Sequence, residues 1–520
     1  MSSSLVIAAY IRNTPHSSLL DASHLELLQQ FQEMRGFFRG LKSKGVFLRD
    51  NSIFHLADRC VEGGLVFLVF FTPLAMGSAD AWAFSIMEMA VFIIFAVHIA
   101  KLSAGKKIEL TITAEFALLL LFLGFTVLQL LPLPERLISF LSPEADKLYS
   151  ALADNPAGRW RTITLNPHAT GQEIFKLISY ILLFFVVINH YRTFEQIKRV
   201  VHTVMLMGAG LAVFAVIQKL AWNGKFFWVF PAGEGVASNT FRVWGPYINH
   251  NHFAGYMEMA IPLGMGLVLY NISKAGPFTG LPLRKKLAVF AGTKEFTAVI
   301  FSSLCVFVST GVLFMSLSRG GIIGFLASIL FFVAMAYTRK SLKKKAALIA
   351  GVGLILGLLL VISAWGRIES RFEEIGEEER IARFDIWRDA SGIVRDFPLA
   401  GTGLGTFKNI YTRYQSEHPT LFFAHAENDY IEILTDTGIP GFIIAISAVC
   451  VFFASLMKRW RERRDAFVVS MALGGMSSCV ALSVHSLSDF NLRIPANAML
   501  ITIISALTWA CVHNIARRSA

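Results

Sequence analysis

The chain has 520 residues, of which 54% are hydrophobic and only 16% are charged, and its mean hydropathy is +0.56. Soluble domains carry charge on about a quarter of their residues, so this composition indicates an integral membrane protein. The formal net charge of +12 does not point to nucleic acid, because the basic residues occur in short clusters between apolar segments. That distribution is typical of membrane topology, and no nucleic-acid partner is expected.

The first part of the chain, residues 1–61, lacks the basic-then-apolar pattern of a cleavable signal peptide. Leu27, Phe31, Met34 and Phe38 recur at helical spacing among basic residues. This pattern fits either an amphipathic helix on the cytoplasmic leaflet or a disordered tail. We therefore expect residues 1–61 to be a cytoplasmic segment.

Twelve segments are long and apolar enough to cross a bilayer, which takes roughly twenty residues. They lie at residues 63–81, 84–100, 113–132, 174–190, 201–219, 253–272, 296–316, 320–338, 346–364, 439–457, 466–485 and 495–514. The sequence thus predicts an all-α polytopic membrane protein with about 12 transmembrane helices. Residues 62–364 would hold spans one to nine, and residues 438–520 spans ten to twelve and a short cytoplasmic tail.

The basic clusters predict the orientation of these spans. A cluster follows every even-numbered span, for example Lys106 and Lys107 after the second. By the positive-inside rule both termini then lie in the cytoplasm. The opposite face, periplasmic in a bacterium, carries residues 133–172, 220–252, the turn around Arg319, a long polar segment at 365–437, and 486–494. We expect residues 365–437 to be a large helical periplasmic catalytic loop.

His425 is the residue in this loop best suited to acid–base chemistry. Helical spacing from His425 places Asn428, Asp429 and Glu432 on one face. Asp429 could then accept a hydrogen bond from the imidazole, which would fix its tautomer and strengthen the other nitrogen as a base. The alternative is an interfacial His at a helix start with no catalytic role.

Two arginines on the same face indicate an anion site. Arg319 lies between two apolar segments with almost no loop, where a charge is costly unless it is paired, snorkels or binds an anion. Arg242 precedes the sixth span. Because guanidinium binds phosphate bidentately, the pair predicts a phosphate or diphosphate site. The alternative for each is an interfacial anchor.

Two further motifs have structural interpretations. Asn249 and the histidines at 250 and 252 have no third ligand nearby in the sequence, so we expect polar residues at a helix start, able to line a cavity, rather than a metal site. Gly401-x-Gly403-x-Gly405 lacks the strand–helix context of a dinucleotide motif, so we expect a turn.

Five motifs occur in order and carry a resemblance: Gly245–Tyr256, Ser318–Gly321, Arg383–Phe407, His425–Tyr430 with Thr437–Gly441, and His485–Pro495. Together they resemble the O-antigen ligase/polymerase superfamily of bacterial membrane glycan transferases. This superfamily includes lipopolysaccharide O-antigen ligases, Wzy-type polymerases and O-linking oligosaccharyltransferases. The resemblance covers roughly residues 200–500.

The resemblance implies a GT-C-like glycosyltransferase that uses no metal or cofactor and takes its glycan from undecaprenyl diphosphate. The family's essential His corresponds to His425, which would deprotonate an acceptor hydroxyl for inverting attack. Its arginines correspond to Arg242 and Arg319, which would stabilise the departing diphosphate, with Arg388 as a further candidate. The residues expected to support this site are Asn428, Asp429, Tyr430 and Asn249.

The expected location is the bacterial inner membrane, with the active site facing the periplasm. The acceptor would be a glycan or a lipid A core, and the other partners membrane lipids and polysaccharide assembly or export proteins. Ligase, polymerase and protein O-glycosylation all remain open. An alternative function is a transporter or flippase of lipid-linked glycans, although the sequence shows no inverted repeat. A third is a non-catalytic scaffold in an export complex.

Overall fold

A computed structural model describes residues 51–104, 110–152, 160–231, 243–274, 282–345, 351, 376–417 and 421–515. Three predictions lie largely or wholly outside these residues: the amphipathic helix around 27–38, the ninth span at 346–364, and the position of Arg242. The chain divides into two compact units, Met1–Arg59 with Ile99–Ile108, and Cys60–His98 with Glu109–Ala520. Every site residue discussed below belongs to the second unit.

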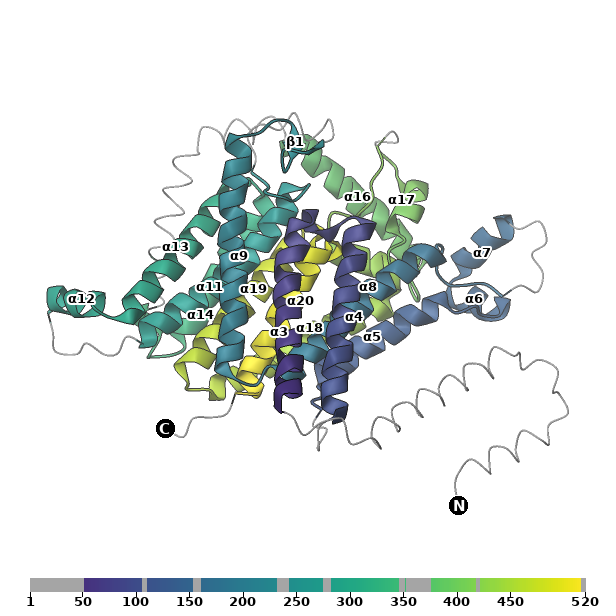
Figure 1. Cartoon of the computed structure of the whole chain (residues 1–520). Helices are drawn as coiled ribbons and strands as arrows, with labels where there is room; N and C mark the ends of the chain where they lie inside the picture. The colour runs from purple at the N-terminus through teal and green to yellow at the C-terminus, as the bar shows by residue number, and fades with distance from the viewer. Residues whose placement is uncertain are drawn as a thin grey trace, which may run out of the picture. The chain divides into compact units, whose positions relative to one another are not determined.

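The described chain is almost entirely helical (Figure 1). The helices are α3 (Asn51–Leu74), α4 (Ala81–Ala104), α5 (Ala114–Leu130), α6 (Glu135–Leu141), α7 (Pro143–Leu152), α8 (Pro167–His190), α9 (Phe194–Leu220), α11 (His250–Lys274), α12 (Leu283–Ala291), α13 (Lys294–Met315), α14 (Arg319–Tyr337), α16 (Gly376–Asp396), α17 (Phe407–Tyr414), α18 (Asp429–Glu462), α19 (Ala466–His485) and α20 (Pro495–His513). Two 3-10 turns, η1 (Met76–Ser78) and η2 (Asn491–Arg493), and one hairpin of β1 (Lys225–Phe226) and β2 (Phe230–Pro231) complete the fold.

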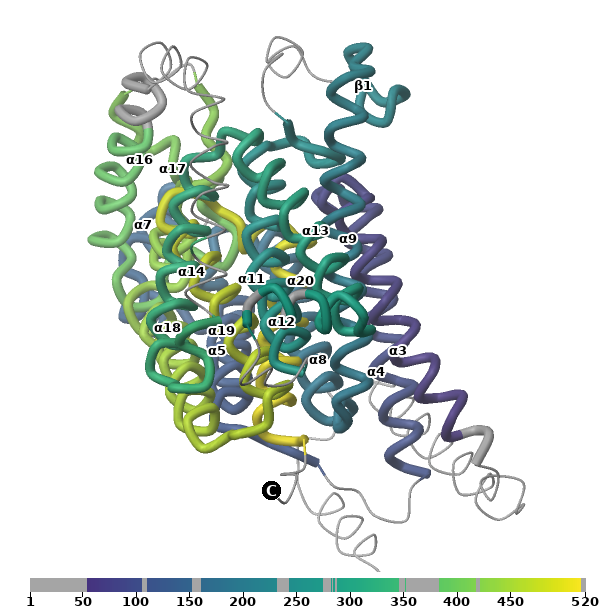
Figure 2. The backbone as a smooth tube through the Cα atoms, turned by 90° about the vertical axis from the view of Figure 1, so that its left-hand side faces the viewer, coloured from purple at the N-terminus to yellow at the C-terminus, as the bar shows by residue number. Residues whose placement is uncertain are grey.

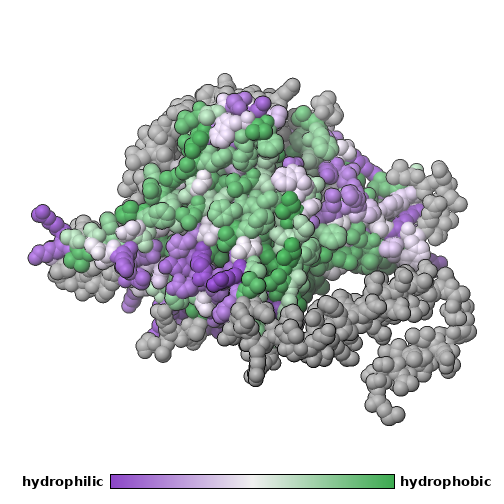
Figure 3. Space-filling view, in the orientation of Figure 1, coloured by the Kyte–Doolittle hydropathy of each residue, from purple (hydrophilic) through white to green (hydrophobic). Residues whose placement is uncertain are grey.

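Nine helices in the described residues are long and apolar enough to cross a membrane, and α5 is a shorter apolar helix. This confirms the predicted all-α polytopic membrane protein. Apolar residues such as Leu206 and Val213 on α9 and Ile300 and Leu304 on α13 remain exposed. Figure 3 shows a broad hydrophobic face, as expected for helices whose solvent is lipid.

The centre of the bundle is built from α11, α19 and α20, which are mostly buried, whereas α4 and α18 expose most of their apolar surface. Glycines allow α11 and α19 to approach closely. A Cβ added to Gly266 would lie 2.6 Å from the Ser470 carbonyl, and one added to Gly474 would lie 2.7 Å from the Pro262 carbonyl. Such small-residue contacts are how membrane helices gain packing energy without a hydrophobic driving force between them.

The helices α16 and α17 lie together at one end of the bundle, which also carries β1 and is called the loop end here (Figures 1 and 2). They share a small core with the start of α18, formed by Ile386, Ile393, Phe397, Phe407 and Tyr411 among others. The described part of the predicted loop 365–437 is therefore helical over Gly376–Asp396 and Phe407–Tyr414.

The predicted turn at the three glycines is confirmed too. Gly401, Gly403 and Gly405 have φ values of 67°, 109° and 80°, a region that favours glycine. Gln129 of α5 holds this turn by donating to the carbonyls of Ala400 and Asp436, both at 2.8 Å. The turn thereby ties α5 to the first turns of α18.

Two predicted span boundaries are wrong. The first span was expected at 63–81, but α3 ends at Leu74 and the chain turns through η1, where Met76, Gly77 and Ser78 all have positive φ. The tenth was expected to begin at 439, but α18 begins at Asp429 and continues through a kink at Gly438 (φ 66°). This first part of α18 begins at the Asn428 N-cap, and its polar side chains Asp429, Glu432, Thr435, Asp436 and Thr437 are buried.

Candidate functional site

His425 lies just before α18 and not within it. Asn428 is the N-cap of α18, and its Oδ1 accepts the backbone N–H groups of Tyr430 and Ile431 at 3.0 and 3.2 Å. The prediction that Asp429 faces His425 across one helical turn is therefore wrong, because His425 precedes the helix. The Asp429 carboxylate instead accepts the backbone N–H of Leu492 at 3.1 Å.

Glu432 is the actual partner of His425. Its Oε1 lies 3.0 Å from His425 Nδ1, and its Oε2 accepts the backbone N–H of Ala426 at 3.2 Å. Glu432 is buried, with only 2% of the side chain exposed. One buried carboxylate thus orients both the imidazole and the backbone that carries it.

Arg493, between α19 and α20, completes this arrangement. Its guanidinium contacts three carboxylates: Glu432 at 2.9 Å, Glu173 of α8 at 3.3 Å, and Asp436 of α18. Lys176 of α8 pairs with Glu173 at 2.7 Å. These five residues together with His425 are called the Arg493 cluster here. Three carboxyl groups therefore face the two cations Arg493 and Lys176.

The hydrogen bonds fix the tautomer of His425. The Glu432 carboxylate pairs with Arg493 and accepts the backbone N–H of Ala426. It is therefore ionised and can only accept hydrogen bonds. Nδ1 of His425 must therefore donate, which leaves the lone pair on Nε2. Burial lowers the pKa of His425, but the neighbouring Glu432 carboxylate raises it more, and the net pKa lies above 6.5. With 30% of its side chain exposed, His425 is an accessible base.

Phe490 fixes the plane of the imidazole. The two rings are stacked, with centroids 4.0 Å apart and an interplanar angle of 16°. The segment 486–494 that carries Phe490 is held to α18, since the backbone N–H of Asp429 donates to the carbonyls of Ser486 and Asp489 at 3.0 and 3.2 Å. The catalytic candidate is thus fixed on two sides, by Glu432 and by Phe490.

A second ionic group lies deeper, and is called the Asp489 cluster here: Glu258 and His252 of α11, His485 of α19 and Asp489. His485 Nδ1 lies 3.0 Å from Glu258, and its Nε2 lies 3.6 Å from Asp489. His252 Nε2 lies 3.2 Å from Asp489. His252 is therefore a partner within a buried network, and it also packs edge-on against Phe490 at 4.7 Å.

Arg319 begins α14, directly beside this network. A Cβ on the next residue, Gly320, would lie 2.5 Å from the His485 ring, and a Cβ on Gly324 would lie 2.6 Å from Glu258 Oε2. The predicted short turn is confirmed, with Ser318 as N-cap accepting from the backbone of Gly321 at 3.2 Å. The start of α14 and His425 thus both lie against the 485–494 segment, and Arg319 itself is exposed.

The remaining predicted residues have local roles. Arg388 pairs with Asp385 at 3.1 Å and Asp389 at 3.5 Å, and donates to Ser416 at 2.7 Å. Its guanidinium therefore stabilises the α16–α17 region. Tyr430 donates its hydroxyl to the Ser483 carbonyl at 2.8 Å. Asn249 accepts the backbone N–H of Asn251 at 2.8 Å where α11 begins.

The sequence reasoning missed Arg493, Phe490 and Glu173. A signal was present, because Asp429, Glu432 and Asp436 recur at helical spacing beside an apolar span. Carboxylates placed there need a cation or a donor. Arg493 lies in a segment already assigned to the same face.

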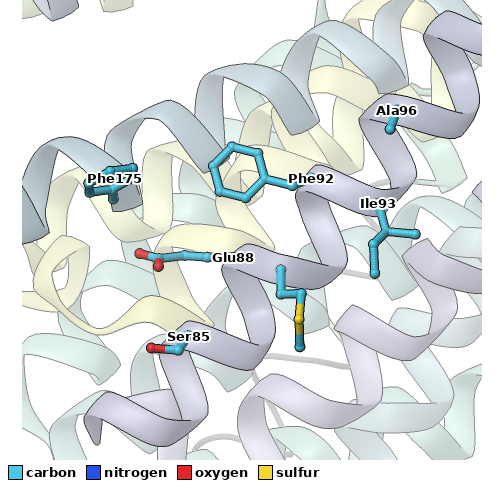
Figure 4. Close-up of a pocket in the computed structure, with 7 residues that line it drawn as sticks. Ser85, Glu88, Phe92, Ile93, Ala96 and Phe175 are labelled. Carbon is cyan, nitrogen blue, oxygen red and sulfur yellow. The ribbon is translucent and has the colours of Figure 1, made fainter. Parts of the chain in front are cut away.

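An open pocket of about 580 Å³ lies elsewhere, along α4 (Figure 4). It is lined by Ser85, Glu88, Met89, Phe92, Ile93 and Ala96 of α4, with Phe175 of α8. None of the predicted site residues lines it. Its mostly apolar, exposed lining fits a lipid-facing helix surface rather than a reaction site.

Among the described residues, no group of three or more His, Cys, Asp or Glu side chains is arranged to hold a metal ion. Comparison with known families gives one finding: residues 304–446 match the family model described as O-antigen ligase. This match includes Arg319, His425 and Glu432, but ends before Arg493. No curated protein shows a significant match to the chain.

Proposed function

Because residues 304–446 match the O-antigen ligase family model, we propose that the chain is a member of the O-antigen ligase/polymerase superfamily. We propose that it transfers a glycan from undecaprenyl diphosphate to an acceptor hydroxyl, with His425 as general base. The observation that carries this proposal is the His425–Glu432–Arg493 chain of contacts at 3.0 and 2.9 Å. An imidazole oriented by a buried carboxylate is the arrangement by which enzymes activate hydroxyl nucleophiles.

In the proposed reaction, Nε2 of His425 takes the proton of the acceptor hydroxyl. The oxygen attacks the anomeric carbon from the side opposite the phosphate, and the bond to the phosphate oxygen breaks with its electron pair leaving on the diphosphate. The configuration at the carbon inverts. Uptake of the proton places a positive charge on the imidazole beside the Glu432 carboxylate, which favours this step.

The departing diphosphate needs positive charge. Arg319 and the N-terminus of α14 supply a guanidinium and helix-end N–H groups in one place, a combination suited to phosphate. Arg242 is the second proposed ligand. Arg388 would have to break its ion pairs with Asp385 and Asp389 before it could bind the diphosphate.

We place this reaction at the periplasmic face of a bacterial inner membrane, with a glycan or a lipid A core as acceptor. Deletion of the gene followed by glycan analysis separates the subtypes. Single repeats attached to the lipid A core indicate a lost polymerase, and accumulated long lipid-linked chains indicate a lost ligase.

The test is glycan transfer by the purified protein in liposomes with lipid-linked glycan and acceptor. The wild-type protein should form the new glycosidic bond, and His425→Ala should lower the rate about 10²- to 10⁴-fold. His168→Ala, at an exposed histidine near the start of α8, is the matched control and should retain activity. Translocation of the lipid without bond formation would support a flippase instead, and full activity of His425→Ala would exclude the general base.

A further inference from the structure

Glu427, two residues after His425, has a backbone conformation that non-glycine residues rarely adopt. Its φ is 52°. Both neighbours are held in place: Trp387 donates its indole N–H to the Ala426 carbonyl at 2.9 Å, and Asn428 donates to the Leu487 carbonyl at 2.9 Å. Strained residues of this kind concentrate at functional sites. The proposed mechanism uses only His425 and Glu432, and it does not explain the strained backbone of Glu427.

The Glu427 carboxylate pairs with α16 at the loop end. Its Oε2 lies 3.6 Å from a guanidinium nitrogen of Arg383, and both side chains remain about 30% exposed (31% for Arg383 and 27% for Glu427). Burial and the nearby Asp489 carboxylate raise the pKa of Glu427 above its usual range. The pair thus presents a bidentate acceptor and a bidentate donor beside the imidazole.

Aromatic side chains adjoin this pair. Phe384, next to Arg383, is 58% exposed, and its ring packs edge-on against Trp387 with centroids 5.3 Å apart. Trp387 is in turn anchored to the backbone of Ala426, the residue after His425. Phe384 is thus the exposed ring of this aromatic pair, and its partner Trp387 is tied to the backbone beside His425.

A sugar ring matches these two kinds of group. One face of a pyranose is a patch of C–H groups that packs against an aromatic ring, and its neighbouring hydroxyls both donate and accept, so they suit a carboxylate–guanidinium pair. A diphosphate does not match, because the Glu427 carboxylate would repel it. These groups therefore suit the acceptor sugar and not the phosphate end of the donor.

We propose that Arg383, Phe384, Trp387 and Glu427 form the subsite that holds the acceptor sugar, with the reacting hydroxyl at Nε2 of His425. This inference rests on the proposed function, because it assumes that a hydroxyl is deprotonated at His425. Arg383 and Glu427 hydrogen-bond the sugar hydroxyls, and the aromatic pair packs on the ring face.

The first test needs no catalysis. The probes are two oligosaccharides released from the source bacterium, the single repeat unit and the lipid A core oligosaccharide, and their binding to full-length His425→Ala protein is followed by saturation-transfer NMR. One probe should bind, and adding Glu427→Gln, which keeps the backbone and the size of the side chain, should weaken its binding at least about tenfold. Absence of binding by both probes, or unchanged binding after Glu427→Gln, would overturn the subsite.

The second test measures transfer in liposomes. Glu427→Gln and Phe384→Leu should raise the KM for acceptor about tenfold and leave the KM for donor unchanged. The control is Phe140→Leu, at an exposed phenylalanine of α6. If Phe384→Leu keeps the normal acceptor KM, the ring contacts lipid and not sugar, and the proposal fails. The transfer activity of His425→Ala tests the proposed function separately, because the NMR binding test does not require catalysis.

Discussion

The Arg493 cluster and the Asp489 cluster both pair histidine with buried carboxylates but differ in the access to their histidines. His485 has carboxylates at both ring nitrogens and is 1% exposed, whereas His425 has a carboxylate at Nδ1 only and is 30% exposed. A His–carboxylate pair is therefore not by itself an indication of catalysis. The difference teaches that a base needs one nitrogen oriented and the other reachable, and that the fully enclosed group serves to hold α11, α19 and the 486–494 segment together.

The largest effect is expected from Arg493→Gln. It removes the cation shared by Glu432, Asp436 and Glu173 and leaves buried carboxylates uncompensated. Breaking a buried pair in this way costs about 3–5 kcal/mol of stability. Both the thermal midpoint in detergent and the transfer rate should fall sharply. An unchanged midpoint would show that the Arg493 cluster does not hold α8 and α18 together.

His485→Gln should separate the two clusters. It removes a side chain that lies between Glu258 and Asp489, so the thermal midpoint should fall by an amount comparable to that for Arg493→Gln. The specific activity of the folded fraction should remain within a few-fold of the wild type, because His485 does not contact His425. A folded His485→Gln protein as inactive as His425→Ala would contradict the division into a reactive and a structural cluster.

Glu432→Gln should change both the rate and its pH dependence. Because the pKa of His425 lies above 6.5, the base form increases, and kcat/KM rises, as the pH rises through that pKa. Glu432 raises this pKa, whereas burial and Arg493 lower it and Glu427 raises it further. Removing the Glu432 charge should therefore move the rising limb of the plot of kcat/KM against pH to lower pH. It should also reduce the maximal rate about 10- to 100-fold. Movement of the limb to higher pH would exclude Glu432 as the orienting carboxylate.

Arg319→Lys should have the smallest effect, because it preserves the charge at the start of α14. A point charge cannot replace a bidentate fork, so we expect about a tenfold loss in kcat and a normal thermal midpoint. Retained kcat would indicate that Arg319 is an interfacial anchor. This variant tests whether the anion site, unlike the base, depends on geometry as well as charge.

Most of the fold could be predicted because apolar length alone defines a spanning helix. His425 and Arg319 could be selected as candidates because each stands out locally in the sequence. The pairing of Arg493 with Glu173 and Glu432 could not be predicted, because these two carboxylates come from helices distant in the sequence. Asp429 was predicted as the partner of His425 in place of Glu432, and this was wrong because the helix begins only after its N-cap, Asn428. The Asn–Asp pair is a local sequence signal for a helix start, which helical periodicity alone does not reveal.

The position of Phe490 has a consequence for protons. Its ring stacks on His425 and packs edge-on against His252, and a benzene ring cannot carry a hydrogen-bonded proton. In the proposed reaction, a proton taken from the acceptor would have no route through Phe490 into the Asp489 cluster, and it would leave from the exposed part of His425. Each turnover would then release its proton on the side where the glycan is transferred, so the reaction would neither consume nor build a proton gradient.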